Sequence, residues 1–109
     1  MATPINTFKT VTANLSTTSE TLYTAPPITS TIILMAQVTN VGTIAENVTA
    51  LHYDGIAVST ELVKDFVVPP NDAVGVLVGK LILTPSQSFI ASSSANASLK
   101  ITLSLLETK

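Results

Sequence analysis

The sequence predicts an all-β protein: an antiparallel β-sandwich, of jelly-roll or immunoglobulin-like type, with about seven to nine short strands. Two observations support this fold class. Apolar and polar residues alternate with a period of two along most of the chain. Turn signals rich in Pro, Gly, Asn, Asp or Ser recur about every eight to twelve residues. No segment shows a convincing helical period, so we expect no helix.

The length of 109 residues fits one ordinary domain with a single core. Residues 1–7 are polar and contain a proline, and we expect them to form a short N-terminal arm ahead of a single sandwich domain, 8–109. The arm is either a frayed terminus or a segment that reaches onto a neighbouring subunit. It has neither a basic start nor an apolar stretch, so no signal peptide is predicted.

The first strands follow from alternation and from proline. In the first strand, 9–15, Val11, Ala13 and Leu15 share one face. The second strand, 20–24, ends at Pro26-Pro27, because proline cannot donate a ladder hydrogen bond.

The third strand, 31–40, is apolar on both faces in its first half. We expect one face, the main core stripe, to hold Ile32, Leu34, Ala36 and Val38. The opposite face is expected to hold Ile33 and Met35.

The second half of the chain continues the same pattern. A strand over 46–53 leads into Asp54-Gly55, which is typical of a two-residue hairpin turn, and the chain returns through 56–58. The remaining strands are expected over 61–68, 73–78, 80–83, 88–92 and 97–105, with a bend at Gly79. The last of these strands has the cleanest alternation in the chain.

The composition argues against several classes of partner. The chain has no cysteine, which excludes a disulfide framework and a thiolate metal site. It has no arginine, its five lysines are scattered and its net charge is −2, so we expect no nucleic-acid partner. The longest apolar run, 32–36, is too short to cross a bilayer, so we expect no membrane partner. Charged residues make up only 11% of the chain, which favours a protein that works within an assembly.

No residue pattern predicts a reaction, a cofactor or a metal. His52 is the only histidine, and Asp54 lies on the same strand face. His52 is either an ordinary strand residue beside a turn, a catalytic base oriented by Asp54, or a metal ligand together with Asp54. Glu61 and Asp65 lie about 13 Å apart along one strand, too far for the paired carboxylates of a glycosidase. The glycines around Lys80 lack the remainder of a phosphate-loop motif. We therefore expect no enzyme and no catalytic residue.

Several segments of the chain resemble small virion structural proteins of tailed bacteriophages. The resemblance covers roughly residues 20–106 and departs at Pro27, where glycine would be expected. It rests on the segments LYTAP at 22–26, AQVTN at 36–40, VVPPN at 67–71, GKLIL at 79–83 and the final alternating strand. The resemblance implies a β-sandwich module located in the virion, either decorating or cementing the capsid or placed in the neck, baseplate or fibres.

We therefore expect a capsid cement or decoration protein that clamps neighbouring capsid subunits without covalent bonds. Its partners would be other copies of itself, as a homotrimer, and other virion proteins, first the major capsid protein. The candidate subunit contacts are Ile33, Met35 and Leu106, which alternation places opposite the main core stripe; alternatively, they form a second part of the core. The other functions left open are a neck, baseplate or tail-fibre module and a carbohydrate-binding sandwich at a cell surface. The last is weakened because the aromatic residues are few and dispersed.

Overall fold

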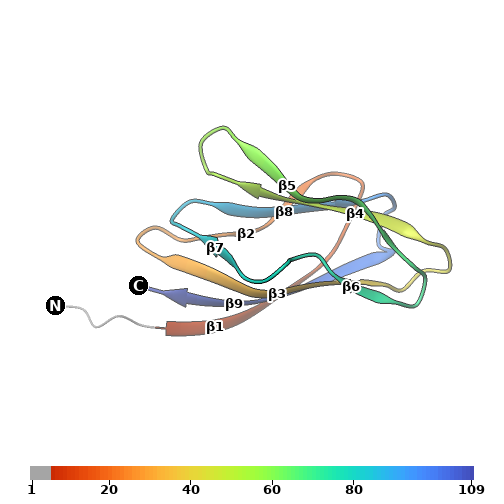
Figure 1. Cartoon of the computed structure of the whole chain (residues 1–109), viewed down its shortest axis with the longest axis horizontal. Coiled ribbons are helices and arrows are strands. Elements are labelled where there is room, and N and C mark those ends of the chain that lie inside the picture. The colour runs from red at the N-terminus through yellow and green to blue at the C-terminus, as the bar shows by residue number, and fades with distance from the viewer. Residues whose placement is uncertain (1–5) are drawn as a thin grey trace.

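The computed structural model describes residues 6–109 and shows two antiparallel sheets packed face to face (Figure 1). Sheet A contains, in spatial order, β1 (Asn6–Asn14), β9 (Leu99–Thr108), β3 (Ser30–Asn40) and β6 (Ala73–Gly75), and β7 (Leu81–Leu83) also pairs with β3. Sheet B contains, in spatial order, β2 (Glu20–Thr24), β8 (Ser88–Ser93), β4 (Glu46–Tyr53) and β5 (Ser59–Val68). The predicted all-β sandwich is therefore confirmed.

The strand pairing decides between the two kinds of sandwich that the sequence left open. β1 pairs with β9, β2 with β8, β3 with β6 and β7, and β4 with β5, so the pairs are nested like the two arms of one long hairpin. Folding that hairpin across its middle brings β9 against β3 and β8 against β4, as observed. This nested order is the order of a jelly roll. β6 and β7 act as two pieces of one strand, interrupted at residues 76–80, where Gly79 has a φ of 83°.

Most strand ranges agree with the alternation in the sequence. β2 and β4 begin and end at the predicted residues. The alternation over 97–105 places five residues on one face; Leu99, Ile101, Leu103 and Leu105 are buried in β9, whereas Ala97 lies before the strand and is exposed. β1 begins at Asn6, so only residues 1–5 of the expected arm lie outside the described residues. No helix that could span a membrane occurs among residues 6–109.

The predicted faces of the third strand are wrong in its first half. The pairing of β3 with β9 shifts register between Ile33 and Met35, so Leu34 has no direct partner and forms a β-bulge. The extra residue reverses the alternation, since each step along a strand changes the face. Ile33, expected opposite the core stripe, is fully buried in the core together with Ala36, and it has no exposed surface in the single chain. Ile32 lies on the outer face instead.

The predicted two-residue turn at Asp54-Gly55 is also wrong. The connection between β4 and β5 spans residues 54–58, and Asp54 organises it. One carboxylate oxygen of Asp54 accepts hydrogen bonds from the N–H groups of residues 56–58, at 2.8, 2.9 and 3.0 Å. These bonds hold the pKa of Asp54 below its usual value. The Asp54 side chain thus supplies the hydrogen-bond acceptor that a longer loop needs. The preference of Asp-Gly for two-residue turns does not predict this loop.

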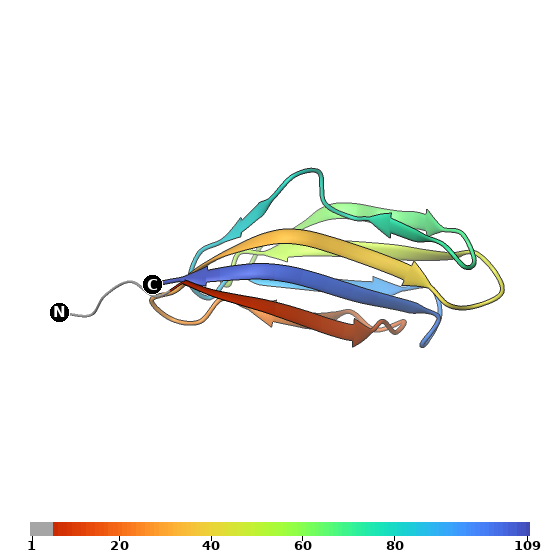
Figure 2. The same ribbon diagram turned by 90° about the horizontal axis from the view of Figure 1, so that it is seen from below.

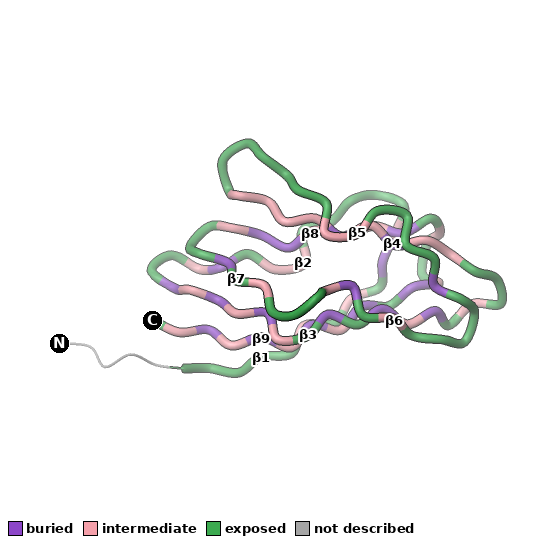
Figure 3. The backbone as a smooth tube through the Cα atoms, in the orientation of Figure 1, coloured by how far each residue is buried: buried purple, intermediate pink, exposed green. Residues whose placement is uncertain are grey.

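The core fills the space between the sheets, as the buried segments in Figure 3 show. Two polar residues, Thr31 and Asn40, have no exposed surface. Asn40, at the end of β3, donates hydrogen bonds to the carbonyl groups of Ile44 at 2.8 Å and Val68 at 3.0 Å, and its oxygen accepts one from the N–H of Gly42 at 2.8 Å. Asn40 therefore closes the turn after β3 and ties it to the end of β5.

Candidate interaction surface

The outer face of sheet A carries a continuous apolar row. Leu106 on β9 pairs directly with Phe8 on β1 and with Ile32 on β3, and Ile32 pairs directly with Ile82 on β7. Directly paired residues of an antiparallel sheet point to the same face. Phe8 is 74% exposed and Ile82 is 61% exposed, so this face is turned to solvent. We call these four residues the outer row. Figure 2 shows the strands that carry it lying side by side.

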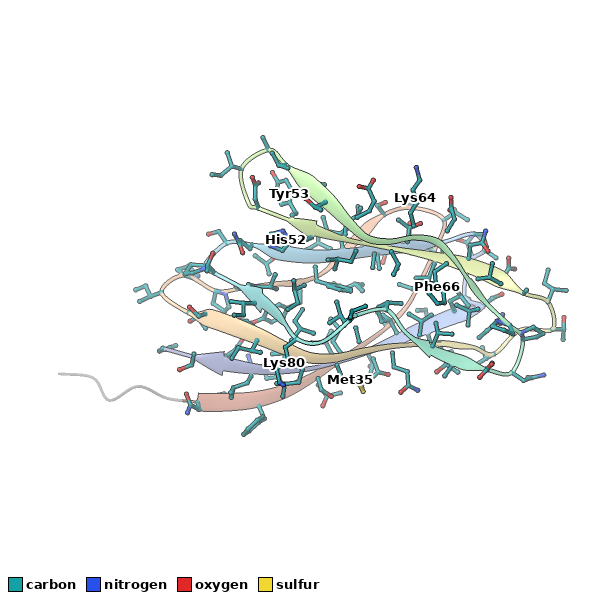
Figure 4. All side chains as sticks on the ribbon, viewed as in Figure 1. Met35, His52, Tyr53, Lys64, Phe66 and Lys80 are labelled. Carbon is teal, nitrogen blue, oxygen red and sulfur yellow. The ribbon has the colours of Figure 1, made fainter. Side chains whose placement is uncertain are left out.

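Met35 extends the apolar surface beside the outer row. It is 37% exposed and points away from the other sheet (Figure 4). Its direct partner on β9 is Ser104, which in turn pairs with Thr10 on β1. Two of the three candidate contact residues, Met35 and Leu106, therefore lie on this outer face, whereas Ile33 lies in the core.

The outer face of sheet A holds very little charge. The strands of sheet A contain three charged residues within the described chain: Lys9, Lys100 and Glu107. Glu107 is buried, and Lys9 forms an ion pair with it at 3.0 Å. Both belong to the inner side of the sheet, because their direct partners Leu105 and Thr31 are buried. Among these strand residues, Lys100 is left as the charge of the outer face, and Lys80 is exposed immediately before β7.

The outer face of sheet B differs in this respect. Its half-buried apolar pair, Leu51 and Ile90, is followed in the same cross-strand row by Glu61 on β5. Lys64, also on β5, is exposed and points outward from this layer (Figure 4). The apolar surface on sheet B is therefore bounded by charge, whereas the outer row of sheet A reaches from β1 to β7 without any.

A polar cluster fixes sheet A against sheet B at the end where the outer row lies. The hydroxyl of Tyr23, on β2, donates a hydrogen bond to the carboxylate of Glu107 and accepts one from the Thr31 hydroxyl at 2.8 Å. Burial, and then the Glu107 carboxylate, raise the pKa of Tyr23 to about 12. The hydrogen bond from Tyr23, and then Lys9, hold the pKa of Glu107 below its usual value. The tyrosine before the proline corner therefore joins β2 to β1, β3 and β9.

The structure does not bring together the titratable residues that the sequence analysis singled out. His52 is half-buried, and its Nε2 lies 3.2 Å from the side-chain oxygen of Gln87, while Asp54 binds its own loop. Within residues 6–109, no group of three His, Asp or Glu side chains could hold a metal ion. Lys80 lies in the exposed stretch between β6 and β7 (Figure 4).

A shallow hollow of about 440 Å³ lies on sheet A at the far end from the outer row. It is lined by Thr12, Ala13, Asn14, Lys100, Ile101 and Thr102. Lys100 can donate hydrogen bonds to a neighbour, and the hydroxyl and amide groups can donate or accept them, but the lining holds no acid to pair with the lysine.

Sequence reasoning missed most of the outer row. The alternation along β1 did indicate the position of Phe8. Residues 11, 13 and 15 face the core, so even-numbered residues of the same strand, including Phe8, face outward. No such signal existed for Ile82, since all three residues of β7 are apolar and give no alternation. Ile32 was assigned to the core because the bulge at Leu34 leaves no mark in the sequence.

No family model and no curated protein matches the chain. Among solved structures, a subunit of the disulfide-linked pili that form Bacillus endospore appendages aligns over 97% of this chain and 87% of its own, with a TM-score of 0.59 and 13% identity. A chain of the T13 viral particle of IBDV aligns over 94% of this chain and 31% of its own, with a TM-score of 0.55 and 9% identity.

This chain therefore spans about a third of the IBDV chain. A pentameric capsid protein from metagenomic phage sequences, with a TM-score of 0.45 and 16% identity, falls below the level at which we infer a shared fold. The two structures above that level come from a pilus and a viral particle, and this chain shares their fold.

Proposed function

We propose that this chain is a structural subunit of a virion that serves as a capsid cement or decoration protein. In this proposal it clamps neighbouring capsid subunits by non-covalent contacts and catalyses no reaction. The observation that carries the proposal is the outer face of sheet A, where apolar and hydroxyl side chains are exposed with almost no charge. A free surface of this kind gains free energy when a partner covers it. The resemblance of residues 20–106 to tailed-phage virion proteins supports the virion as the location.

The proposed partners are further copies of the chain, as a homotrimer, and the major capsid protein. Symmetric trimers are the natural form at the threefold positions of a capsid, and closed symmetry is the rule among homo-oligomers. Met35 and Leu106 remain the proposed subunit contacts. Ile33 is left out, because its side chain is fully buried within one copy.

A filament subunit is a second candidate, favoured by the likeness to the endospore appendage subunit over nearly the whole of both chains. The chain has no cysteine, so its copies would join without disulfides, unlike the pili in that comparison. The free edge of β1 suits such joining, since an exposed strand edge can pair with a strand of a neighbour. A neck, baseplate or tail-fibre module would use the same surfaces at another place on the particle.

Two experiments test the proposal. Electron cryo-microscopy of particles that contain this protein should find the jelly roll on the capsid shell. Density confined to the neck, tail or fibres would show that the protein is a component of those structures instead. Purified protein added to capsids that lack it should raise their survival of heat or osmotic shock, and absence of any protection contradicts a cement role. Filaments formed by the purified protein alone favour the second candidate, and clear hits on a glycan array favour a carbohydrate-binding module.

A further inference from the structure

We infer that a second copy of this chain covers the outer row of sheet A, with Met35 beside it, so that this row is the contact between copies. The inference rests on the proposed function and adds the residues of the contact. Because the row faces its own equivalent on the second copy, this contact has two-fold symmetry and differs from the threefold contact of the proposed homotrimer. Of the four residues in the row, only Leu106 was among the expected contacts.

The outer row is continuous across the whole width of sheet A. Its residues sit on four different strands, and each is the direct cross-strand partner of the next. At the usual strand separation the row is about 15 Å long from β1 to β7. Neighbouring side chains in such a row touch one another, so they form one surface rather than scattered apolar residues.

The core of the single chain does not use this surface. Ile32, Leu34 and Leu106 are half-exposed and are absent from the apolar residues that pack against the core. With Phe8, Ile82 and Met35, they expose on the order of 400 Å² of apolar surface, which reaches the size of patches that are often functional. Burying this surface on two copies, with the threonine and serine side chains around it, removes about 1,000 Å², the size that a specific interface needs.

The charge distribution points to an identical copy as the occupant. Identical copies carry identical charges, so a charged face would repel itself, whereas the outer row and Met35 contain no charged residue. Lys100 is six residues from Leu106 along β9, about 20 Å away, which exceeds the screening length at physiological salt. Lys80, two residues before Ile82, is exposed at the β7 end of the row and is the nearest lysine in sequence to Ile82. A partner recognised by negative charge would therefore find a complement at that end of the row and none within it.

The shape of the surface agrees with this occupant. The hollow on sheet A lies at the Thr12, Asn14 and Lys100 end and not over the outer row. An open sheet face suits the packing of one sheet on another, about 10 Å apart. The apolar pair on sheet B offers no equivalent surface, because its row ends at Glu61.

The test uses three variants with the same change in charge. Phe8→Lys and Ile82→Lys add a lysine to the outer row, and Ile56→Lys is the matched control in the loop between β4 and β5, where the side chain is 85% exposed. Sedimentation velocity over a concentration series should find a multiple of 11.4 kDa for the wild type and for the control. The two row variants should dissociate at protein concentrations at least tenfold higher than those at which the wild type does.

A second measurement does not depend on destabilising the contact. The chain has no cysteine, so Met35→Cys introduces a single thiol, and assembly should slow its reaction with a maleimide. Ile56→Cys should react equally fast in monomer and assembly. Three results would each overturn the inference. The first is that the Met35→Cys thiol reacts with the maleimide at the same rate in monomer and assembly. The others are that the row variants assemble like the wild type, or that the wild type stays monomeric at high concentration.

Capsid binding, measured in parallel, separates this inference from the proposed function. If the wild type protects capsids and the row variants still assemble normally, the contact is refuted and the cement role is supported. Row variants that dissociate as expected, with no protection of capsids by the wild type, would refute the cement role and support the contact.

Discussion

The proline corner after β2 depends on one residue in an unfavourable backbone conformation. Ile28 has a φ of 61°, in the left-handed region that β-branched residues avoid. The N–H of Thr29 donates to the carbonyl of Pro26 at 3.2 Å, which makes Ile28 the third residue of a turn. A type II turn requires a positive φ at this position. The Ile28 side chain is 87% exposed, so little burial compensates for the strain.

Replacing Ile28 with asparagine should therefore stabilise the protein. Asparagine tolerates the left-handed region, and relieving the strain should raise the free energy of unfolding by about 1 kcal/mol. Urea denaturation followed by circular dichroism measures the change. Ile56→Asn is the control, because Ile56 is equally exposed and has no positive φ. Equal effects of the two substitutions would contradict a strained Ile28.

The hydrogen bond between Tyr23 and Glu107 makes stability depend on pH in two directions. Unfolded Tyr23 releases its proton near pH 10, whereas the folded protein keeps it to about pH 12, so stability should fall as the pH rises between these values. The pKa of Glu107 is lowered on folding, so its contribution is complete above its ordinary value of 4.5 and is lost as the pH falls through the folded pKa.

Tyr23→Phe tests this coupling. The variant leaves the buried Glu107 carboxylate without its phenolic donor, which should cost about 1.5–3 kcal/mol at neutral pH. Urea midpoints should also lose much of their decline between pH 10 and 12. Tyr53→Phe keeps the cluster intact and should retain the wild-type decline. A Tyr23→Phe variant with the wild-type alkaline profile would refute the assignment.

At the scale of the strands, prediction succeeded where alternation was long and failed where it was short or interrupted. Residues 99–105 of β9 alternate cleanly, and the buried face of this stretch was predicted correctly. The bulge at Leu34 reversed the faces of β3 because its cause is a mismatch with β9, a partner distant in sequence. The surface that we propose as a contact therefore depends on pairing, which the order of residues along one strand does not contain.

The loop between β4 and β5 packs tightly against the turn between β7 and β8, and Gly55 makes this possible. Gly55 has a φ of 85°, and an added Cβ would lie 2.6 Å from the carbonyl oxygen of Ser86. Gly55→Ala should therefore lower the free energy of unfolding by about 1–3 kcal/mol. Thermal denaturation checks this expectation.

Gly75→Ala is the control for that substitution, at a glycine that has neither a positive φ nor a close neighbour. The nearest atom to an added Cβ at Gly75 is the Ala36 carbonyl oxygen, at 4.0 Å. The control should therefore change stability by no more than about 0.5 kcal/mol. If Gly55→Ala were as mild as Gly75→Ala, the two turns would not be in contact in the way that the structure indicates.

At the scale of the molecule, the jelly roll gives its two outer faces different properties. Within residues 6–109, sheet A combines a nine-residue edge strand, β1, with an apolar outer row. Sheet B ends in β5, where register shifts and the positive φ of Asp65 disturb the edge. Such irregularities are devices by which natural sheets avoid pairing with neighbours. Association is therefore expected on the side of sheet A.

An assembly formed through this uncharged surface should respond to salt and temperature in a characteristic way. Raising sodium chloride from about 0.05 to 1 M screens ion pairs but should leave the dissociation constant of the wild type nearly unchanged. Cooling should weaken association, because the hydrophobic contribution to binding falls at low temperature.

In Phe8→Lys, the residual association should become tighter at high salt, since screening reduces the repulsion between facing lysines. Sedimentation velocity at both salt concentrations measures these effects, and a wild-type assembly that dissociates at 1 M salt would mean that ion pairs, not the outer row, hold the copies together.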